Sequence, residues 1–260
     1  MAFSNRVYRH SFTDSTCDST SNSNFASSTS ASATTFPSWP PGKVVCVGRN
    51  YADHAAELNN PLPDQPLLFL KPSTAMIGFS DSLALVARRG EHHFETEMTL
   101  LIGRPLRCCN QTEAMAAIAG VGVGLDLTLR GLQNELKGKG HPWERAKAFD
   151  GSCVLSPFAR MTDDLRLQNL SFRLWKNNEL VQEGNTSDML FPVLSLIEEI
   201  TQTFSLMPGD VIMTGTPKGV GPLAAGDILQ AELDSLMTVK TKVRVETMVT
   251  ERTTVALNNE

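Results

Sequence analysis

The chain has 260 residues, of which 41% are apolar and 20% are charged, and its formal net charge at pH 7 is −5. Proteins that bind nucleic acid through its phosphates usually carry an excess of basic residues, so the acidic balance argues against that class. No stretch approaches the roughly 18 consecutive apolar residues that a membrane-spanning helix needs. We therefore expect a soluble protein that has neither nucleic acid nor a membrane as a partner.

The cysteines indicate a reducing compartment. Five cysteines are too few for a disulfide scaffold in a chain of this length. No two of them have the C-x-x-C spacing of a zinc ribbon or a thioredoxin-like site. This usage favours the cytoplasm. The residues are Cys17, Cys46, Cys108, Cys109 and Cys153.

The first 42 residues differ in composition from the rest of the chain. Between Ser11 and Phe36, 15 of 26 residues are Ser or Thr. Such a segment has too little apolar surface to offset the entropy that is lost when it becomes ordered. We predict a disordered tail over residues 1–42, ending in a proline-rich linker, and one globular domain over residues 43–260.

An organelle transit peptide is the alternative interpretation of the tail. Arg6, Arg9 and the serine-rich run suit such a peptide, which would place the protein in mitochondria. Asp14 and Asp18 lie within the run, however, and no amphipathic helix bearing arginines is evident. The sequence therefore favours an untargeted tail.

Residues 43–260 show mainly strand patterns. Leu170, Phe172 and Leu174 alternate with polar residues, as in a strand with one buried face. Strand patterns outnumber helical ones and do not alternate with them as βαβ units do, which favours an α+β, predominantly β and mostly antiparallel fold. In chain order we predict a strand at 44–47, a helix at 51–58, strands at 65–70 and 93–103, helices at 113–119 and 127–137, a hairpin that turns at 177–178, an amphipathic helix at 192–204 and a strand at 239–245.

Three acidic residues form a candidate metal site. Glu95 and Glu97 lie two residues apart in a predicted strand and therefore project from the same face. Asp126 follows the apolar, glycine-rich segment 119–125, where a lone ionised side chain would be costly to bury. Carboxylate oxygens of this kind suit Mg²⁺ or Mn²⁺. Taken alone, the Glu-x-Glu pair also fits a solvated strand face.

His54 and Glu57 form a candidate catalytic pair. On the predicted helix they lie three residues apart and share a face, so the carboxylate can hold the imidazole by a hydrogen bond. A histidine held in this way can activate water as a general base near neutral pH. A surface ion pair on a short helix is the simpler alternative.

Further polar groups lie in apolar or glycine-rich surroundings. Lys71 ends an apolar strand, and Lys147 lies between Trp143 and Phe149. The segment 214–221 is a glycine-rich loop with hydroxyls and backbone N–H groups that can meet an anion, although it lacks the residue order of a Walker loop. A plain hairpin turn is its alternative. The sequence has no G-x-S-x-G motif of serine hydrolases.

Taken together, these motifs resemble the fumarylacetoacetate hydrolase family, and within it the small single-domain branch of acylpyruvate hydrolases and oxaloacetate decarboxylases or tautomerases. The resemblance spans about residues 43–245 and implies a mixed β-sheet roll of the family's C-terminal-domain type with flanking helices, a homodimer, and one Mg²⁺ or Mn²⁺ per subunit. The motifs are Gly48-Arg49-Asn50-Tyr51 with His54 and Glu57, Phe69-Leu70-Lys71-Pro72, Glu95-x-Glu97, Leu125-Asp126-x-Thr128-x-Arg130-x-x-Gln133, Lys147-Ala148-Phe149-Asp150 and Thr214-Gly215-Thr216-Pro217-x-Gly219-Val220-Gly221.

The resemblance also implies roles for individual residues. Glu95, Glu97 and Asp126 match the family's metal ligands. Lys147 matches the lysine beside the metal. Substrate contacts are implied for Arg49, Lys71, Gln133 and Thr216.

The resemblance also covers the catalytic pair, and the chain departs from the family pattern at one position. His54 and Glu57 match the family's water-activating pair, on a lid that orders over the substrate. Relatives commonly have an acidic residue after the arginine that matches Arg130, whereas this chain has Gly131. The change loosens a contact behind the ligands but leaves the ligands intact.

The leading hypothesis is hydrolysis of the C–C bond of acylpyruvate-type 2,4-dioxo acids to pyruvate and a carboxylic acid. The metal would stabilise charge developing on the 2-oxo acid, His54 would deprotonate the attacking water, and Lys147 would supply positive charge. Decarboxylation of oxaloacetate, or interconversion of its keto and enol forms, needs the same site without attacking water, so both stay open. An isomerase or hydratase of aromatic catabolism and a non-catalytic binding protein are further alternatives.

Overall fold

The computed structural model describes residues 10, 12–13, 39–86 and 89–246. Most of the predicted tail, with its predicted disorder and its alternative transit peptide, lies outside the described residues, as do Cys17 and residues 247–260 of the predicted domain. Within the described ranges, no helix is long and apolar enough to cross a membrane.

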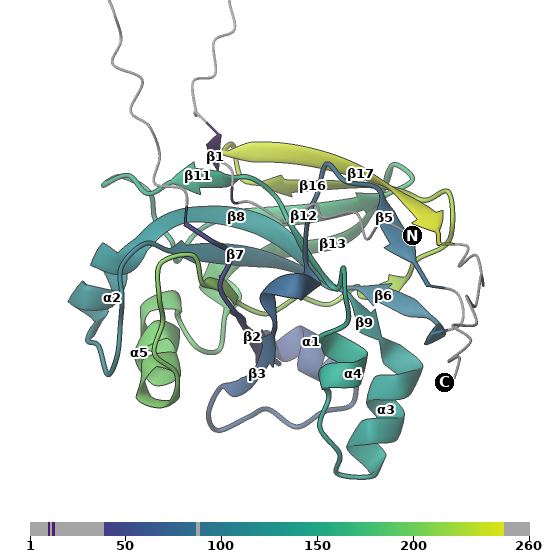
Figure 1. The fold of residues 1–260 in the computed structure, drawn as a ribbon, viewed down its shortest axis with the longest axis horizontal. Helices are drawn as coiled ribbons and strands as arrows, with labels where there is room; N and C mark the ends of the chain where they lie inside the picture. The colour runs from purple at the N-terminus through teal and green to yellow at the C-terminus, as the bar shows by residue number, and fades with distance from the viewer. Residues whose placement is uncertain (1–9, 11, 14–38, 87–88, 247–260) are drawn as a thin grey trace, which may run out of the picture.

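The largest sheet in the described part of the chain is built around two long antiparallel strands, β7 (Thr96–Ile102) and β8 (Ile118–Asp126), which curve across the middle of Figure 1. All of β7 and nearly all of β8 is buried. A strand covered on both faces has a continuous apolar run rather than an alternating pattern. The other strands of this sheet are β1 (Phe12–Thr13), β2 (Val44–Gly48), β3 (Leu67–Lys71), β4 (Met76–Gly78), β10 (Cys153–Leu155), β11 (Phe158–Arg160) and β14 (Val211–Met213).

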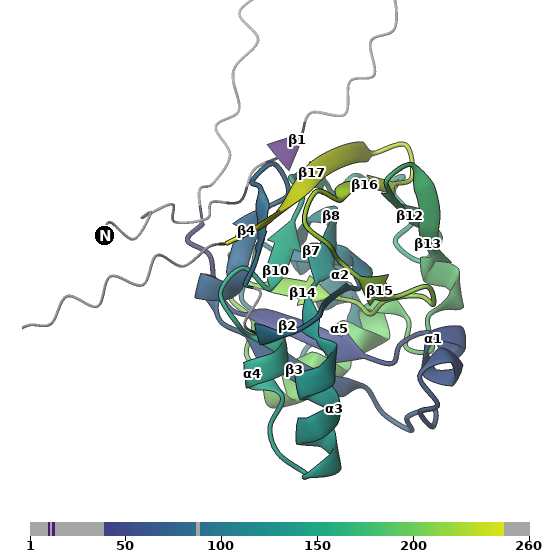
Figure 2. The ribbon, with the colours of Figure 1, turned by 90° about the vertical axis from the view of Figure 1, so that its right-hand side faces the viewer.

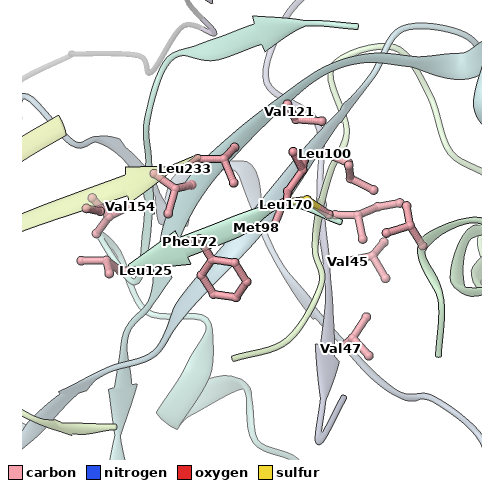
Figure 3. Packing of buried hydrophobic residues seen from close by; sticks show 14 of the residues in the cluster. Val45, Val47, Met98, Leu100, Val121, Leu125, Val154, Leu170, Phe172 and Leu233 are labelled. Atoms are coloured by element: carbon pink, nitrogen blue, oxygen red, sulfur yellow. The ribbon is translucent and has the colours of Figure 1, made fainter. Parts of the chain in front are cut away.

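A second sheet packs against the first and encloses the main core. Its strands follow the order β13-β12-β16-β17-β5, and β12 and β16 lie against β7 and β8. Met98 and Leu100 from β7 meet Phe172 and Leu233 from the second sheet, and all four are almost completely buried (Figure 3). The strands are β5 (Leu83–Leu85), β12 (Ser171–Lys176), β13 (Glu179–Asn185), β16 (Ile228–Leu233) and β17 (Met237–Val245).

A small sheet joins the largest sheet at the place where the acidic residues lie. Its middle strand, β6 (His92–Phe94), pairs with β9 (Thr128–Leu129) and β15 (Gly221–Pro222). The chain passes from β6 into β7 at Glu95, and from β8 into β9 at Leu127. Glu95 and Leu127, at which the chain passes between the two sheets, therefore lie at the same end of the β7–β8 pair.

The helices gather on one side of the sheets (Figures 1 and 2). α2 packs against α5, and α3 lies beside α4 near β3. A capping box starts α2, because the side chain of Asn110 accepts from the N–H of Glu113 and the Glu113 carboxylate accepts from the N–H of Asn110. The helices are α1 (Ala52–Glu57), α2 (Gln111–Ala117), α3 (Arg130–Gly138), α4 (Glu144–Lys147) and α5 (Val193–Thr203), with 3-10 turns at Ser73–Ala75 and Thr186–Asp188.

The predicted α+β, predominantly β class is confirmed, with antiparallel pairs outnumbering four parallel ones. The predicted hairpin also forms, and Asn177 and Asn178 turn it with φ of 54° and 69°. Three predicted elements differ. The predicted helix 113–119 forms at Gln111–Ala117, because Ile118 already begins β8. The predicted strand 93–103 is divided at Glu95, and the predicted helix 127–137 begins only at Arg130, because the residues before it pair with β6 as β9.

Candidate active site

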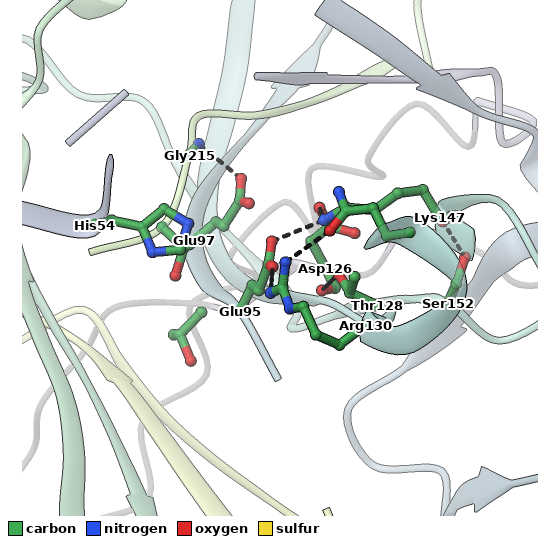
Figure 4. Close-up of polar contacts among 12 residues, drawn as sticks. His54, Glu95, Glu97, Asp126, Thr128, Arg130, Lys147, Ser152 and Gly215 are labelled. Atoms are coloured by element: carbon green, nitrogen blue, oxygen red, sulfur yellow. Dashed lines mark hydrogen bonds and ion pairs between the residues drawn. The ribbon is translucent and has the colours of Figure 1, made fainter. Parts of the chain in front are cut away.

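Three carboxylates meet where the small sheet joins the largest one. Glu97 lies in β7 opposite Gly124, and Asp126 ends β8. The backbone N–H of Asp126 donates to the carbonyl of Glu95 at 2.8 Å, which ties the two crossing points together. One carboxylate oxygen from each residue lies within 4.8 Å of the others, and all three side chains are buried (Figure 4).

Buried cations neutralise this acidic cluster. The ammonium of Lys147, at the end of α4, donates to Glu95 at 2.7 Å and to Asp126 at 2.6 Å. The guanidinium of Arg130, at the start of α3, donates to the other oxygen of Glu95. Charge-assisted bonds of this kind make it possible to bury ionised carboxylates together.

Lys71 contacts the cluster but does not line the pocket described below, and its role as a substrate contact stays a prediction. Its side chain is completely buried, forms an ion pair of 2.7 Å with Asp126, and donates to the carbonyl of Lys147. It also donates to the carbonyl and the hydroxyl of Ser152, each at 3.1 Å. Lys71 ends β3, and its side chain is completely enclosed by the protein.

The surroundings shift the pKa values of Glu95, Glu97 and Lys147 in different ways. Burial favours the neutral acid, but the charges of Lys147 and Arg130 outweigh burial and hold the pKa of Glu95 well below its ordinary value. Burial, followed by the negative charge of Asp126, raises the pKa of Glu97 well above its ordinary value. For Lys147, the charges of Asp126 and Glu95 outweigh burial and raise the pKa of the ammonium.

This donor set fits a hard divalent cation. It offers carboxylate oxygens only. Among the described residues, no cationic side chain bonds to Glu97, which accepts a hydrogen bond from the N–H of Gly215 at 2.7 Å. A divalent cation would supply positive charge next to Glu97. The role of these residues as metal ligands stays a prediction.

His54 and Glu57 lie on α1 as expected and contact each other, with 3.2 Å between Nδ1 of the ring and Oε2 of the carboxylate. His54 is buried, and its ring lies beside Glu97 in Figure 4. Glu57 has a second partner that the sequence does not reveal, because its Oε1 accepts from the N–H of Gly219 at 2.9 Å. The carboxylate therefore links the histidine to the loop 214–221.

The loop 214–221 differs from its predicted role as an anion-binding turn with free N–H groups. The N–H groups of Gly215 and Gly219 already donate to the carboxylates of Glu97 and Glu57. Both glycines have a positive φ, of 103° and 96°, and a Cβ on Gly219 would lie 2.1 Å from the carbonyl of Val181. Only glycine fits there.

A pocket of about 460 Å³, counting its open mouth, brings most of the predicted residues together. Among the predicted site residues, Glu57 and Lys71 do not line it. Sequence reasoning gave no role to several residues that do line it, including Arg130 and Lys137 from α3. The lining consists of Val47, Gly48, Arg49, His54, Leu58, Asn60, Leu67, Phe69, Glu95, Glu97, Asp126, Arg130, Gln133, Lys137, Trp143, Lys147 and Thr216.

The fold and the site together define a curled, predominantly β domain with a buried three-carboxylate cluster at the base of a pocket. Residues 43–244 match the family described as fumarylacetoacetate (FAA) hydrolase C-terminal, and the chain belongs to this family. The expected family is confirmed, and the chain is an enzyme of this family, as the named activities of its relatives indicate.

Two curated relatives are similar over most of their length. The chain is 46% identical to oxaloacetate tautomerase YcgM of Escherichia coli over 199 residues, which cover 75% of this chain and 90% of the relative. It is 41% identical to the mitochondrial oxaloacetate tautomerase FAHD1 of Bos taurus over 206 residues, which cover 79% and 93%.

A solved structure with a different named activity is also similar. It is the fumarylpyruvate hydrolase from Pseudomonas aeruginosa in complex with Mn²⁺ and pyruvate, which has a TM-score of 0.77 and 30% sequence identity. The match covers 82% of this chain and 94% of that one.

Proposed function

We propose that the protein is a divalent-metal-dependent oxaloacetate tautomerase, which interconverts the keto and enol forms of oxaloacetate. The observation that carries the proposal is the buried cluster of Glu95, Glu97 and Asp126 in one pocket with His54 and Lys147. The two relatives named for this activity support the choice of reaction. The sequence alone favours acylpyruvate hydrolysis, and the relatives favour the alternative.

Glu95, Glu97 and Asp126 would hold one Mg²⁺ or Mn²⁺, which when bound would supply positive charge to the keto oxygen of a 2-oxo acid. The Mn²⁺ and pyruvate in the Pseudomonas aeruginosa relative support a divalent ion and a 2-oxo acid. Arg49, Gln133 and Thr216 remain our proposed substrate contacts, since all three line the pocket.

We assign proton transfer to His54. In the tautomerisation a proton leaves C3 of the keto form and a proton is added to the oxygen on C2, so no other reactant is consumed. Lys147 keeps its proton, because the neighbouring carboxylates raise its pKa. Glu57 holds Nδ1 of His54, which leaves Nε2 to exchange the proton with the substrate. The ammonium of Lys147 supplies charge beside the forming oxyanion.

Hydrolysis of a 2,4-dioxo acid is the second candidate. The similarity to a fumarylpyruvate hydrolase favours it, and His54 held by Glu57 would then deprotonate water instead of C3. Decarboxylation of oxaloacetate needs neither proton transfer from C3 nor water. The three reactions therefore differ in their products and in their dependence on His54.

The products decide among the three reactions. The enol form of oxaloacetate is supplied with Mg²⁺, and its absorbance is followed while pyruvate is measured in the same sample. The tautomerase account predicts enol loss that is faster than with Mg²⁺ alone, stops on addition of EDTA, and yields no pyruvate. Pyruvate from oxaloacetate indicates decarboxylation, and pyruvate from acetylpyruvate indicates hydrolysis. Enol loss at the rate of Mg²⁺ alone contradicts the proposal.

The family resemblance and the cysteines also bear on the assembly and the compartment of the protein. We propose the homodimer that the family resemblance implies, which sedimentation would test. The cytoplasm is the compartment expected from the cysteines, and the mitochondrial name of the bovine relative supports the alternative for this chain. Cell fractionation of the tagged full chain distinguishes the two compartments.

A further inference from the structure

One face of α3 carries cations that the proposed chemistry uses only in part. Arg130, Gln133 and Lys137 lie at positions i, i+3 and i+7 of this helix, which share one face. All three line the pocket, and so does Arg49 from the segment between β2 and α1. Two elements that are distant in the sequence therefore direct positive charge into the same space.

Arg49 and Lys137 have no acidic partner in the part of the chain that the structure describes. Among the described residues, the guanidinium of Arg49 makes no hydrogen bond or ion pair. The ammonium of Lys137 donates to the amide oxygen of Asn60 at 3.0 Å, which leaves two of its three N–H groups unused. Burial, and then the charges of Arg49 and Arg130, lower the pKa of Lys137, so these cations are close enough to act on one another.

Arg130 differs from the other two because its charge is already matched. Its guanidinium donates to Glu95 and, at 2.6 Å, to the amide oxygen of Gln133. It contacts Glu95, and its charge also acts on Lys137, so it is close to both the acidic cluster and Lys137. The pocket is thus lined both by the acidic cluster and by the two cations Arg49 and Lys137.

We propose that Arg49 and Lys137 bind the second carboxylate of a 2-oxo dicarboxylate whose 2-oxo acid end lies at the acidic cluster. The inference rests on the proposed function and narrows its substrate class to keto acids with a charged far end, such as oxaloacetate. Unpaired cations in a pocket attract an anion and form charge-assisted hydrogen bonds with it. Asn60 orients Lys137 for this contact.

Binding of two unreactive ligands tests the proposal without turnover. Malate differs from lactate by one carboxylate on C3, and neither can undergo the proposed reaction. Calorimetry with saturating Mg²⁺ is expected to show that malate binds about tenfold or more tightly than lactate, the effect of one charge-assisted bond. Lys137→Met should weaken malate binding about tenfold and leave lactate binding within about twofold.

Matched variants separate this role from a general effect of charge. Lys139 lies two residues further along, is exposed and pairs with Glu135, so Lys139→Met should change neither affinity. Lys137→Arg should keep most of the preference for malate, and Arg49→Met should reduce it as Lys137→Met does. Equal loss of malate and lactate binding in Lys137→Met, or no loss of either, would overturn the proposal.

The experiments distinguish a failure of the subsite from a failure of the tautomerase assignment. If the protein prefers malate through Lys137 but does not convert enol-oxaloacetate, the carboxylate subsite stands and the tautomerase assignment fails. If it converts enol-oxaloacetate and binds malate and lactate equally well, the tautomerase stands and the subsite is wrong.

Discussion

The ammonium of Lys71 and the carboxylate of Asp126 form a buried ion pair with 2.7 Å between nitrogen and oxygen, and side-chain exposures of 0% and 1%. Lys147 is bonded to the other oxygen of Asp126 at 2.6 Å. Asp126 is therefore held between two ammonium groups. This arrangement fixes its orientation before any cation or substrate binds.

Replacing Lys71 should strongly destabilise the protein. Lys71→Met leaves Asp126 with one buried cation, and breaking a buried ion pair by removing one partner costs about 3–5 kcal/mol. The free energy of unfolding in urea measures the loss. As a control, Lys218→Met removes the exposed ion pair with Asp53 and should leave the free energy of unfolding nearly unchanged. Equal stabilities of the two variants would show that the Lys71 pair is dispensable.

Removing the imidazole of His54 should abolish most of the turnover and leave the binding of the divalent cation unchanged. His54→Ala is expected to lower the rate of enol-oxaloacetate conversion about 10²–10⁴-fold, the usual contribution of a general base. Mn²⁺ binding should be unchanged, because the proposed metal ligands are the three carboxylates and not His54. His93→Ala is the control, since His93 pairs with Glu91 away from the pocket. Full turnover by His54→Ala would remove this residue from proton transfer.

The predicted helix at 51–58 and the glutamate pair show which contacts of the site can be predicted from the sequence and which cannot. Spacing alone predicts that His54 and Glu57 share a face, because a three-residue offset on a helix depends only on local geometry. The meeting of Glu97 with Asp126 depends instead on the pairing of β7 with β8. The segment 119–125 carries three glycines, and glycine weakens a strand prediction.

Those glycines are explained by close neighbours rather than by propensity. A Cβ on Gly122 would lie 2.8 Å from the hydroxyl of Ser156, and one on Gly124 would lie 2.8 Å from the carbonyl of Val154. The sequence does not reveal such approaches, so it predicts no strand where β8 forms. The contact of Lys71 with Asp126 also joins residues that are far apart in the sequence, so the sequence does not reveal it.

Gln182 on β13 is expected to position the loop that carries Thr216. Its amide oxygen accepts from the N–H of Thr96 at 2.9 Å, and its NH₂ donates to the hydroxyl of Thr216 at 2.8 Å and to the carbonyl of Pro217 at 3.0 Å. Gln182→Met should lower the free energy of unfolding by about 1–3 kcal/mol, because buried groups lose their partners. It should also raise KM for oxaloacetate.

A second variant removes the hydrogen bonds that Gln182 donates but keeps the one that it accepts. Gln182→Glu keeps an acceptor for Thr96 but presents a carboxylate to the carbonyl of Pro217, which repels it. Because Gln182 is buried, an unpaired carboxylate there is costly, so we expect this variant to be at least as unstable as Gln182→Met while KM stays raised. A KM equal to that of the unmodified protein in both variants would mean that Gln182 supports the fold alone.

Gly131, the residue that departs from the family pattern, should be replaceable with a gain in stability. It lies in the first turn of α3, and a Cβ there would meet nothing within 4 Å. Gly131→Ala should therefore raise the free energy of unfolding by about 0.5–1 kcal/mol, with turnover unchanged. Gly140→Ala is the matched control: it also has open space, but its φ of 66° should make alanine destabilising. Destabilisation by Gly131→Ala would contradict the account of this helix start.

Mn²⁺ titration of the metal-free protein, followed by the electron paramagnetic resonance of free Mn²⁺, tests the central account most directly. The account predicts one site per chain that is lost or greatly weakened in Glu97→Gln, since the amide can still accept from the N–H of Gly215 but carries no charge. Glu91→Gln, which changes an exposed acid beside His93, should bind like the unmodified protein. A chain that binds no Mn²⁺, or whose Glu97→Gln variant binds it equally well, contradicts the account.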